Sequence, residues 1–400
     1  MNLPLSSYFR PILLLGIALL TSSVPSYASD WPQWRGPNRN GISAETGWSS
    51  QWPAGGPKKV WSAKVGEGFS SVAVVGGKVF TAGWANGRDT IWCLNAQTGK
   101  PVWQYSYPCS QGDYGGPRAT PTIDGQNAYI MSREGGVACL NAQTGKVIWG
   151  RDLAKEAGAD APQWGFAGSP LVEGNLVIFN IGSTGAALDK TTGKVVWKSG
   201  QAGGYSSPAA YNLGGQRAVA LFSAKGVIAV NPSNGRTIWQ HPWETSYDVN
   251  AADPIFAGTD VFISSNYGHG CALLRPGGSR AQVVWENKNM KNHFNTCVML
   301  NGGIFGNDEN TLKCIDLKSG NEKWRSRGMG KGGLIASDGK IIVLTERGEL
   351  VVAQATTDRY NELARAKVLD GTCWTHPVLS NGFIYCRSHE GDLVCVDVRK

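Results

Sequence analysis

Hydrophobic and polar positions along the chain follow a unit that recurs to the C-terminus. Each unit starts with a run of small and β-branched residues, turns at a polar or glycine position, and continues into an apolar run, as in residues 70–77 followed by 78–84. A second turn leads to a short polar phrase and then to another apolar run. Short alternating runs between Gly-rich turns predict four β-strands per unit. We expect no amphipathic helix beyond the short segment 153–159.

The polar phrase is the clearest part of the unit. It occurs twice as CLNAQTGK, at residues 93–100 and 139–146, and each copy is followed by x-x-Trp. Further copies begin at Ala187, Ala229, Ala272, Cys314, Val352 and Cys395, so successive units start 38 to 48 residues apart. A repeat of this length made of short strands predicts a β-propeller or a related array.

Tryptophan marks the start of the fourth strand in most units. These positions are Trp61, Trp103, Trp149, Trp197, Trp239, Trp285 and Trp324. Equivalent positions on successive units cannot all face one ligand, so we expect their side chains to pack between blades. Trp61 precedes the first phrase, whereas the last phrase, at Cys395, has no tryptophan after it. We therefore predict an all-β, eight-bladed β-propeller whose last blade is closed by an N-terminal strand around Trp61, which leaves no open edge between the termini.

The form A-L-D-x-x-T-G-K-x-x-W, as in residues 187–197, resembles the repeat of propellers of the pyrroloquinoline-quinone (PQQ) type. That repeat is shared by quinoprotein alcohol dehydrogenases and by the outer-membrane-protein assembly factor BamB. The resemblance covers about residues 57–400. The opening WPQWRGPNRNGIS, residues 31–43, also resembles the start of exported proteins labelled PQQ-binding-like or polyvinyl-alcohol-dehydrogenase-like. The resemblance of the repeat implies a β-propeller fold. It implies either a scaffold protein or an enzyme, because proteins of both kinds have this fold.

The N-terminus reads as an export signal. Residues 1–28 hold one cation, Arg10, an apolar stretch, and a small-residue end at Ala28, which is typical of a signal peptide and too short for a membrane span. No cysteine follows the expected cleavage point that could carry a lipid anchor. We therefore expect an exported, periplasmic or extracellular protein without a transmembrane segment, with residues 29–56 as an N-terminal extension that packs on the propeller, residues 57–400.

Charge and cysteine content narrow the picture further. The net charge of +8 is spread without basic runs, which argues against nucleic-acid binding. The nine cysteines are an odd number for a disulfide framework. Four of them occupy the first position of the phrase, where other units have alanine, so we expect a small buried slot there. Their disulfide pairing stays open.

Ligands of propellers bind at the loops that enter the innermost strands, because these loops converge on the axis. In this chain the loops carry residues able to contact a sugar-like alcohol, a quinone or a peptide, with Arg118 or Lys331 facing an anion. The candidates are Tyr114, Arg118, Trp164, Tyr205, Asp248, Asn250, Asp253, His293, Asn295, Lys331, Trp374 and His376.

Each candidate has a structural interpretation as well. Asp253 and His376 both precede proline at a strand start and could satisfy turn backbone groups. Within the set we favour Asp248, Asn250, His293 and Asn295, which lie on two successive loops. Trp31, Trp34 and Arg35 could plug one face of the ring or staple the terminus down, and we favour the staple.

The sequence lacks the motifs that the enzyme resemblance implies. Quinoprotein dehydrogenases resembling the methanol and ethanol enzymes place an adjacent cysteine pair over the quinone, a Glu/Asn/Asp set on calcium and an aspartate base, and the polyvinyl-alcohol enzymes add C-x-x-C-H. The chain has neither cysteine motif. Asp248, Asn250 and Asp253 could supply the calcium set and the base, which keeps PQQ with calcium as an open cofactor. Zinc, nucleophile-elbow and phosphate-loop motifs are absent, and we expect no other metal.

Two functions therefore remain. We favour a non-enzymatic binding or scaffold protein of the cell envelope, as in BamB, whose partner is an envelope protein, a peptide, or a small polyol or sugar in the funnel. The alternative is a PQQ-dependent dehydrogenase of alcohols or sugars. We expect a monomer.

Overall fold

The computed structural model describes residue 1 and residues 29–400. Beyond Met1, the predicted signal peptide lies outside the described residues. Within them, helical structure is confined to α1 (Leu153–Ala157) and the 3-10 turn η1 (Ser246–Asp248), and α1 falls in the segment expected to be helical. No helix among the described residues has the length and apolar character needed to cross a membrane.

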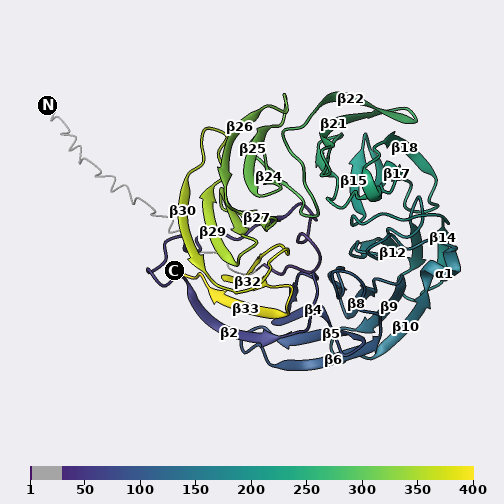
Figure 1. The fold of residues 1–400 in the computed structure, drawn as a ribbon, viewed down its shortest axis with the longest axis horizontal. Coiled ribbons are helices and arrows are strands. Elements are labelled where there is room, and N and C mark those ends of the chain that lie inside the picture. Colours follow the sequence, from purple (N-terminus) through teal and green to yellow (C-terminus); the bar gives the residue numbers. More distant parts are fainter. Residues whose placement is uncertain (2–28) are drawn as a thin grey trace.

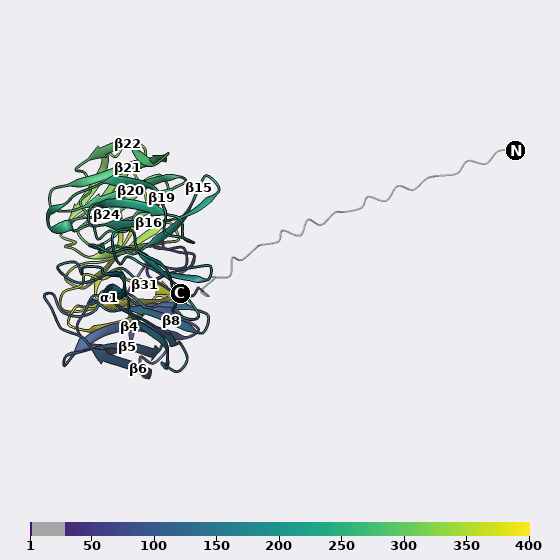
Figure 2. The ribbon, with the colours of Figure 1, turned by 90° about the vertical axis from the view of Figure 1, so that its right-hand side faces the viewer.

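The strands form a β-propeller. The strands of the described residues form seven hydrogen-bonded sheets around a common axis (Figure 1): five have four strands, one has five and one has eight. The side view shows a flattened body (Figure 2). Within each sheet, strands that follow one another in the chain pair antiparallel, because each unit alternates apolar strands with tight turns. The predicted all-β propeller is confirmed.

Three four-stranded sheets come from the first half of the chain and a fourth from the second half. Their strands are β3 (Ala73–Val75), β4 (Lys78–Ala85), β5 (Arg88–Asn95) and β6 (Pro101–Pro108); β7 (Thr122–Asp124), β8 (Asn127–Met131), β9 (Gly136–Asn141) and β10 (Val147–Asp152); β11 (Leu171–Glu173), β12 (Leu176–Phe179), β13 (Ala186–Asp189) and β14 (Val195–Lys198); and β23 (Val298–Leu300), β24 (Gly303–Asp308), β25 (Thr311–Asp316) and β26 (Glu322–Arg327).

The other three sheets differ from this four-stranded pattern. One gains an extra strand, one joins two meanders, and one is completed by the N-terminal strand β2. They contain β1 (Ile42–Ser43) with β27 (Gly333–Ser337), β28 (Lys340–Leu344), β29 (Glu349–Gln354) and β30 (Glu362–Lys367); β15 (Ala209–Leu213), β16 (Gln216–Ser223), β17 (Gly226–Val230) and β18 (Thr237–Pro242) with β19 (Ile255–Ala257), β20 (Asp260–Ser265), β21 (Gly270–Gly277) and β22 (Arg280–Asn287); and β2 (Lys58–Lys64) with β31 (Val378–Ser380), β32 (Phe383–Arg387) and β33 (Asp392–Asp397).

The two ends of the propeller close in one sheet. Strand β2 pairs antiparallel with β33, with Trp61 opposite Cys395 and Lys64 opposite Asp392. Figure 1 shows the purple β2 lying along the yellow β33. The predicted closure by the N-terminal strand is therefore confirmed, and its physical effect is to cover the outer edge of the last sheet.

The phrase binds the tryptophan of the unit before it. Trp61 donates its indole N–H to the carbonyl of Ala96 at 2.8 Å, and a Cβ on Gly99 would lie 2.6 Å from the Trp61 ring. Gly99 has a φ of 68°, so the turn requires glycine both for its backbone and for the ring above it. The same donor geometry recurs from Trp103 to Ala142, Trp149 to Lys190, Trp197 to Pro232, Trp285 to Leu317 and Trp324 to Thr356.

Trp239 departs from this rule. Its indole donates instead to the hydroxyl of Tyr211 in its own unit at 2.6 Å. The next unit replaces the compact phrase with the long β21–β22 hairpin, and Gln240 of β18 pairs in parallel with Arg280 of β22. This bridge joins two four-stranded meanders into the eight-stranded sheet. Because two meanders share one sheet, the number of eight separate blades stays a prediction.

The start of the phrase forms the expected small buried slot. Cys93, Cys139, Cys314 and Cys395 are at most 1% exposed, and the alanines at this position are fully buried. All nine cysteines lie in the described part of the chain, where they are buried and form no disulfide.

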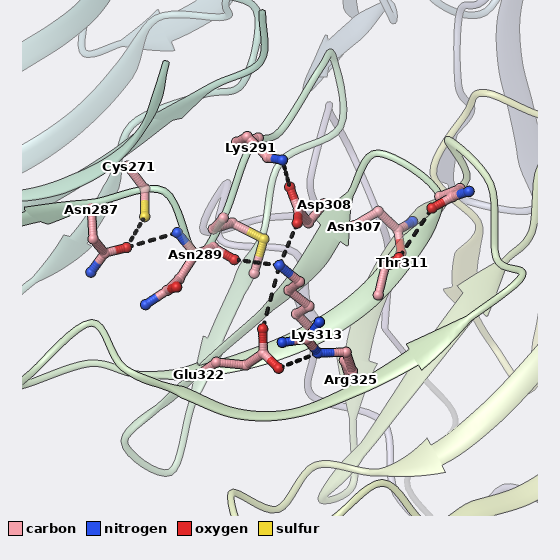
Figure 3. Close-up of polar contacts among 12 residues, drawn as sticks. Cys271, Asn287, Asn289, Lys291, Asn307, Asp308, Thr311, Lys313, Glu322 and Arg325 are labelled. Carbon is pink, nitrogen blue, oxygen red and sulfur yellow. Dashed lines mark hydrogen bonds and ion pairs between the residues drawn. The ribbon is translucent and has the colours of Figure 1, made fainter. Parts of the chain in front are cut away.

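A buried ion cluster crosses the β23–β26 sheet (Figure 3). Lys313 of β25 pairs with Asp308 of β24 and, at 3.4 Å, with Glu322 of β26, and Lys291 lies 3.4 Å from Asp308. Lys313 and Asp308 are each below 10% exposed. The paired charges compensate one another across three strands, so we assign this cluster a structural role.

Candidate functional site

A cavity of about 220 Å³ lies on the propeller axis. Every loop that leads into an innermost strand contributes to it, as the loop pattern predicts, because these loops converge where the sheets meet. Its lining consists of Trp34, Phe69, Tyr114, Arg118, Trp164, Ala167, Ser169, Tyr205, Ser207, Val249, Ala251, Asp253, Tyr267, His293, Phe294, Asn295, Lys331 and Trp374.

The structure brings nine of the twelve candidate residues to this cavity. They are Tyr114, Arg118, Trp164, Tyr205, Asp253, His293, Asn295, Lys331 and Trp374. Loop polarity next to an inner strand is thus a sound guide to position, although position alone does not establish that a residue binds a ligand.

Three candidates lie elsewhere. Asn250 is fully buried, and its amide donates to the carbonyls of Ser223 and Trp243, each at 3.0 Å. Asp248 pairs with Lys225 at 2.9 Å on the surface. His376 is outside the lining, and its Nε2 lies 3.3 Å from the Thr296 carbonyl oxygen. The favoured group of Asp248, Asn250, His293 and Asn295 is therefore divided between structural and cavity positions.

One wall of the cavity combines aromatic rings with cations. Phe69 and Trp374 stack with centroids 5.6 Å apart, and Phe294 lies 4.9 Å from Trp374. Each ring of the stacked pair has a cation over it: the Arg118 guanidinium lies 5.5 Å from Phe69 and the Lys331 ammonium 5.7 Å from Trp374. The wall can therefore hold an apolar ring face and a negative charge side by side.

Neither cation has an acidic partner among the described residues. The Arg118 guanidinium donates to the carbonyls of Tyr114, Asp113 and Gly116 at 2.9 to 3.2 Å. Burial lowers the pKa of Arg118 to about 10, so the group stays charged at neutral pH. Lys331 makes no side-chain ion pair in the part of the chain that the structure describes. Two uncompensated cations at a cavity favour an anionic ligand.

A second aromatic group continues around the mouth. Trp164 lies 6.1 Å from both Tyr205 and Tyr247, and Tyr247 lies 5.7 Å from Tyr267 in an edge-on contact. The Tyr267 hydroxyl is 3.1 Å from Nε2 of His293. Burial, reinforced by Lys331, lowers the pKa of His293 to about 4, so this imidazole is neutral at pH 7 and is a weak base.

Asp253 contributes a carboxyl group to the cavity lining, and both of its oxygens accept hydrogen bonds from the protein. Trp34 donates its indole N–H to Oδ2 at 2.5 Å and the Ser207 amide donates to Oδ1 at 2.7 Å. Burial raises the pKa of Asp253, while the nearby Arg35 and Arg39 act in the opposite direction. The carboxyl therefore anchors Trp34 against the propeller.

The N-terminal residues 31–43 cross the axis of the ring (Figure 1). Ile123 donates its amide to the Pro32 carbonyl at 2.8 Å, the Arg35 guanidinium reaches the Cys297 carbonyl at 2.7 Å, and Arg39 reaches Pro170 at 2.8 Å. The segment then pairs as β1 with β27. We name it the crossing segment. The favoured staple interpretation is incomplete, because the segment plugs the channel and supplies Trp34 to the cavity.

The family of the chain follows from its repeat. A family model described as outer membrane protein assembly factor BamB matches residues 109–326. The chain belongs to this family. Its PQQ-like repeat, expected from the recurring phrase, is thereby confirmed. Comparison with curated proteins gave no match.

Solved structures share the fold at low sequence identity. BamB from Moraxella catarrhalis has a TM-score of 0.66 and 17% identity over 85% of this chain and 99% of its own. The quinohemoprotein alcohol dehydrogenase ADHIIG from Pseudomonas putida HK5 has 0.65 and 13% over 92% and 80%. A europium-containing methanol dehydrogenase has 0.65 and 13% over 92% and 89%. These likenesses place the fold with both a scaffold and enzymes and do not choose between them.

The described residues do not fit a calcium-bound quinone. Asn250 hydrogen-bonds to backbone carbonyls, Asp248 forms a surface ion pair and Asp253 binds Trp34, so the three do not form the oxygen-ligand set that they could have supplied. Across the described residues there is no group of three or more His, Cys, Asp or Glu side chains arranged for a metal. No cysteine is in the cavity lining either, and burial raises the pKa of Cys373, next to Trp374, to about 12.

Four aromatic lining residues were missed as candidates. Phe69 and Phe294 lie in loops recognised as part of the funnel, where an aromatic residue beside an inner strand was the available signal. Trp34 was assigned to the terminus rather than to the site. Tyr267 lies in the turn between β20 and β21. In an antiparallel meander this turn is at the same end as the loop that enters β19, so the strand order was the available signal.

Proposed function

We propose that this protein is a non-enzymatic binding and scaffold propeller of the cell envelope, and that the axial cavity is its ligand site. The observation that carries the proposal is that some polar groups at the axis hold the fold together and others do not. Among the described residues, Arg118 and Lys331 have no acidic partner, whereas Asp253 and Asn250 hydrogen-bond to groups that hold the fold together. Cations left without an acidic partner among the described residues, at a concave aromatic site, favour the binding of a ligand.

The family supports the scaffold part of the proposal. The matching family model carries the name of an assembly factor rather than of an enzyme. A propeller offers loops on both faces as docking surfaces, and protein partners in the envelope are consistent with this arrangement. The export signal predicted from residues 1–28 is in line with this location. Fractionation of cells into cytoplasm and envelope tests it, and recovery in the cytoplasm alone would contradict it.

The second candidate is a PQQ-dependent dehydrogenase of alcohols or sugars. The fold shared with the two solved dehydrogenases and the paired cations of the cavity favour it. The missing adjacent cysteines and the commitment of Asp253 to Trp34 weigh against it.

One experiment separates the two candidates. The purified protein is mixed with PQQ and Ca²⁺, dialysed, and examined for quinone absorbance and for dye reduction with alcohols and sugars. We expect neither stoichiometric quinone nor substrate-dependent reduction. A retained equivalent of quinone together with alcohol-dependent turnover would replace the binding role with the dehydrogenase.

A further inference from the structure

Three tyrosines at or next to the cavity have a strained backbone: Tyr114 and Tyr267 line it, and Tyr247 contacts the Tyr267 ring. Tyr114, Tyr247 and Tyr267 have φ values of 50°, 62° and 56°. A left-handed conformation costs a non-glycine residue about 1–2 kcal/mol. Their side chains are nevertheless 60%, 65% and 37% exposed, so little burial of their own rings offsets this cost. Strain retained at exposed aromatic residues around a cavity is typical of a ligand clamp.

The polar groups beside these rings suit a ligand with several hydroxyl groups. The neutral His293 is held through Nε2 by the Tyr267 hydroxyl, and its buried Nδ1 has no hydrogen-bond partner among the described residues. Asn295 donates its amide to the Lys331 carbonyl at 2.6 Å, and the described residues supply no donor for its Oδ1. The site therefore offers both donors and acceptors close to aromatic faces.

The two cations of the cavity wall indicate that the ligand also carries a negative charge. Phe69 and Trp374 stack on one another and both line the cavity, with His389 stacked on Phe69 at 4.5 Å. Arg118 and Lys331 lie over the two rings without an acidic partner among the described residues. A flat aromatic acid would use the rings and the cations but would leave the hydroxyl, imidazole and amide groups unsatisfied. Unsatisfied polar groups in a site cost affinity, so a ligand that pairs with all three kinds of group is preferred.

We infer that the axial cavity binds an acidic sugar: a pyranose ring that carries a carboxylate, either free or as the end residue of an acidic polysaccharide. Its carboxylate pairs with Arg118 and Lys331, its apolar face lies on the Phe69–Trp374 pair, and its hydroxyl groups meet His293 and the rim tyrosines. This inference rests on the proposed binding function and specifies its ligand class.

Titration calorimetry with tryptophan fluorescence tests the inference, because Trp34, Trp164 and Trp374 line the cavity. The probes are glucuronate and galacturonate, an oligogalacturonate, glucose as the neutral analogue, and benzoate as the aromatic acid. We expect the uronates to bind and to quench fluorescence, with at least tenfold weaker binding of glucose and benzoate. Tighter binding of the oligomer than of the monomer identifies a polysaccharide end as the source, and equal binding identifies the free sugar.

Two site variants and one surface control keep the test independent of folding. Lys331→Met should weaken uronate binding at least tenfold, while Lys59→Met on the exposed strand β2 should leave it unchanged. Tyr114→Gly relieves the left-handed strain, so it should keep or raise the thermal midpoint and still weaken binding. Benzoate binding without uronate binding, no uronate binding at all, or full affinity in both site variants would overturn the inference. Failure here with no PQQ turnover would leave the binding role intact, whereas PQQ turnover would remove both.

Discussion

At the residue scale, the chain separates side chains that maintain the fold from side chains that face the cavity, although their sequence contexts look alike. Asp253 and His376 both precede proline at an inner strand. In the structure Asp253 reaches the cavity and His376 lies behind Trp34, with ring centroids 4.7 Å apart. Local sequence places both residues at the axis, but which one lines the cavity depends on the crossing segment, whose Trp34 lies 219 residues before Asp253.

His376 predicts a pH dependence of stability. Burial, aided by Arg35, lowers its pKa to about 3. An unfolded histidine titrates near about 6.5, so between these values the unfolded chain binds a proton that the folded chain does not. The free energy of unfolding therefore falls as pH drops through this window, by up to about 1.4 kcal/mol per pH unit.

The variant His376→Gln should flatten that slope. Urea unfolding of both proteins between about pH 7 and pH 4 measures it, and since all other groups are shared, the difference between the slopes isolates His376. Equal slopes in the two proteins would show that the imidazole is not held neutral.

At the element scale, the hairpin and the preceding tryptophan act as one unit, which explains why the phrase recurs. The Asn95 side chain accepts the amides of Gln97 and Thr98, each at 3.0 Å, and this fixes the turn. The turn then presents its glycine to the ring of Trp61. Where the phrase is lost, in the unit that begins at Ala272, Trp239 turns to Tyr211 and two meanders merge.

Gly145→Ala should destabilise the protein more than Gly125→Ala. Both glycines have positive φ, 71° and 58°, so both variants carry a backbone cost of about 1–2 kcal/mol. Only at Gly145 would the new Cβ meet a ring, 2.6 Å from Trp103, whereas Gly125 faces open space. We expect about 1–3 kcal/mol of additional loss for Gly145→Ala in urea unfolding. The same loss in both variants would refute the packing role of the phrase.

At the scale of the whole molecule, stability depends on one non-local sheet. Strands β2 and β33 are separated by almost the whole chain yet pair over Lys58–Lys64. The crossing segment makes a second connection by linking loops from opposite sides of the ring. Long-range closure of this kind costs loop entropy, so side-chain anchors on β2 contribute more than equivalent anchors between adjacent units.

Trp61→Ala should therefore weaken the closing sheet more than Trp103→Ala does. Both indoles occupy the same position of the repeat and donate to the next hairpin. Each loses packing of about 3–5 kcal/mol as an upper range. Only Trp61→Ala should also loosen β2, because β2 pairs with β33 from the other end of the chain, whereas β6, which carries Trp103, pairs with the strand directly before it. Hydrogen exchange of Val394 and Val396 measures this, and unchanged protection in Trp61→Ala would contradict the role of Trp61 in closure.

The sequence by itself determined the repeat, the closing pair of Trp61 and Cys395, the buried slot at the phrase, and the loops that supply the cavity. These features follow from a local pattern of residues that recurs in each unit. Only the tertiary structure decided that Trp34 reaches Asp253, that Asn250 and Asp248 leave the site, and that β18 joins β22. The Trp34–Asp253 contact spans 219 residues, and the partners of Asn250 and Asp248 lie 7 to 27 residues away. None of these partners follows from the repeat, because each depends on how the sheets and the crossing segment pack in three dimensions.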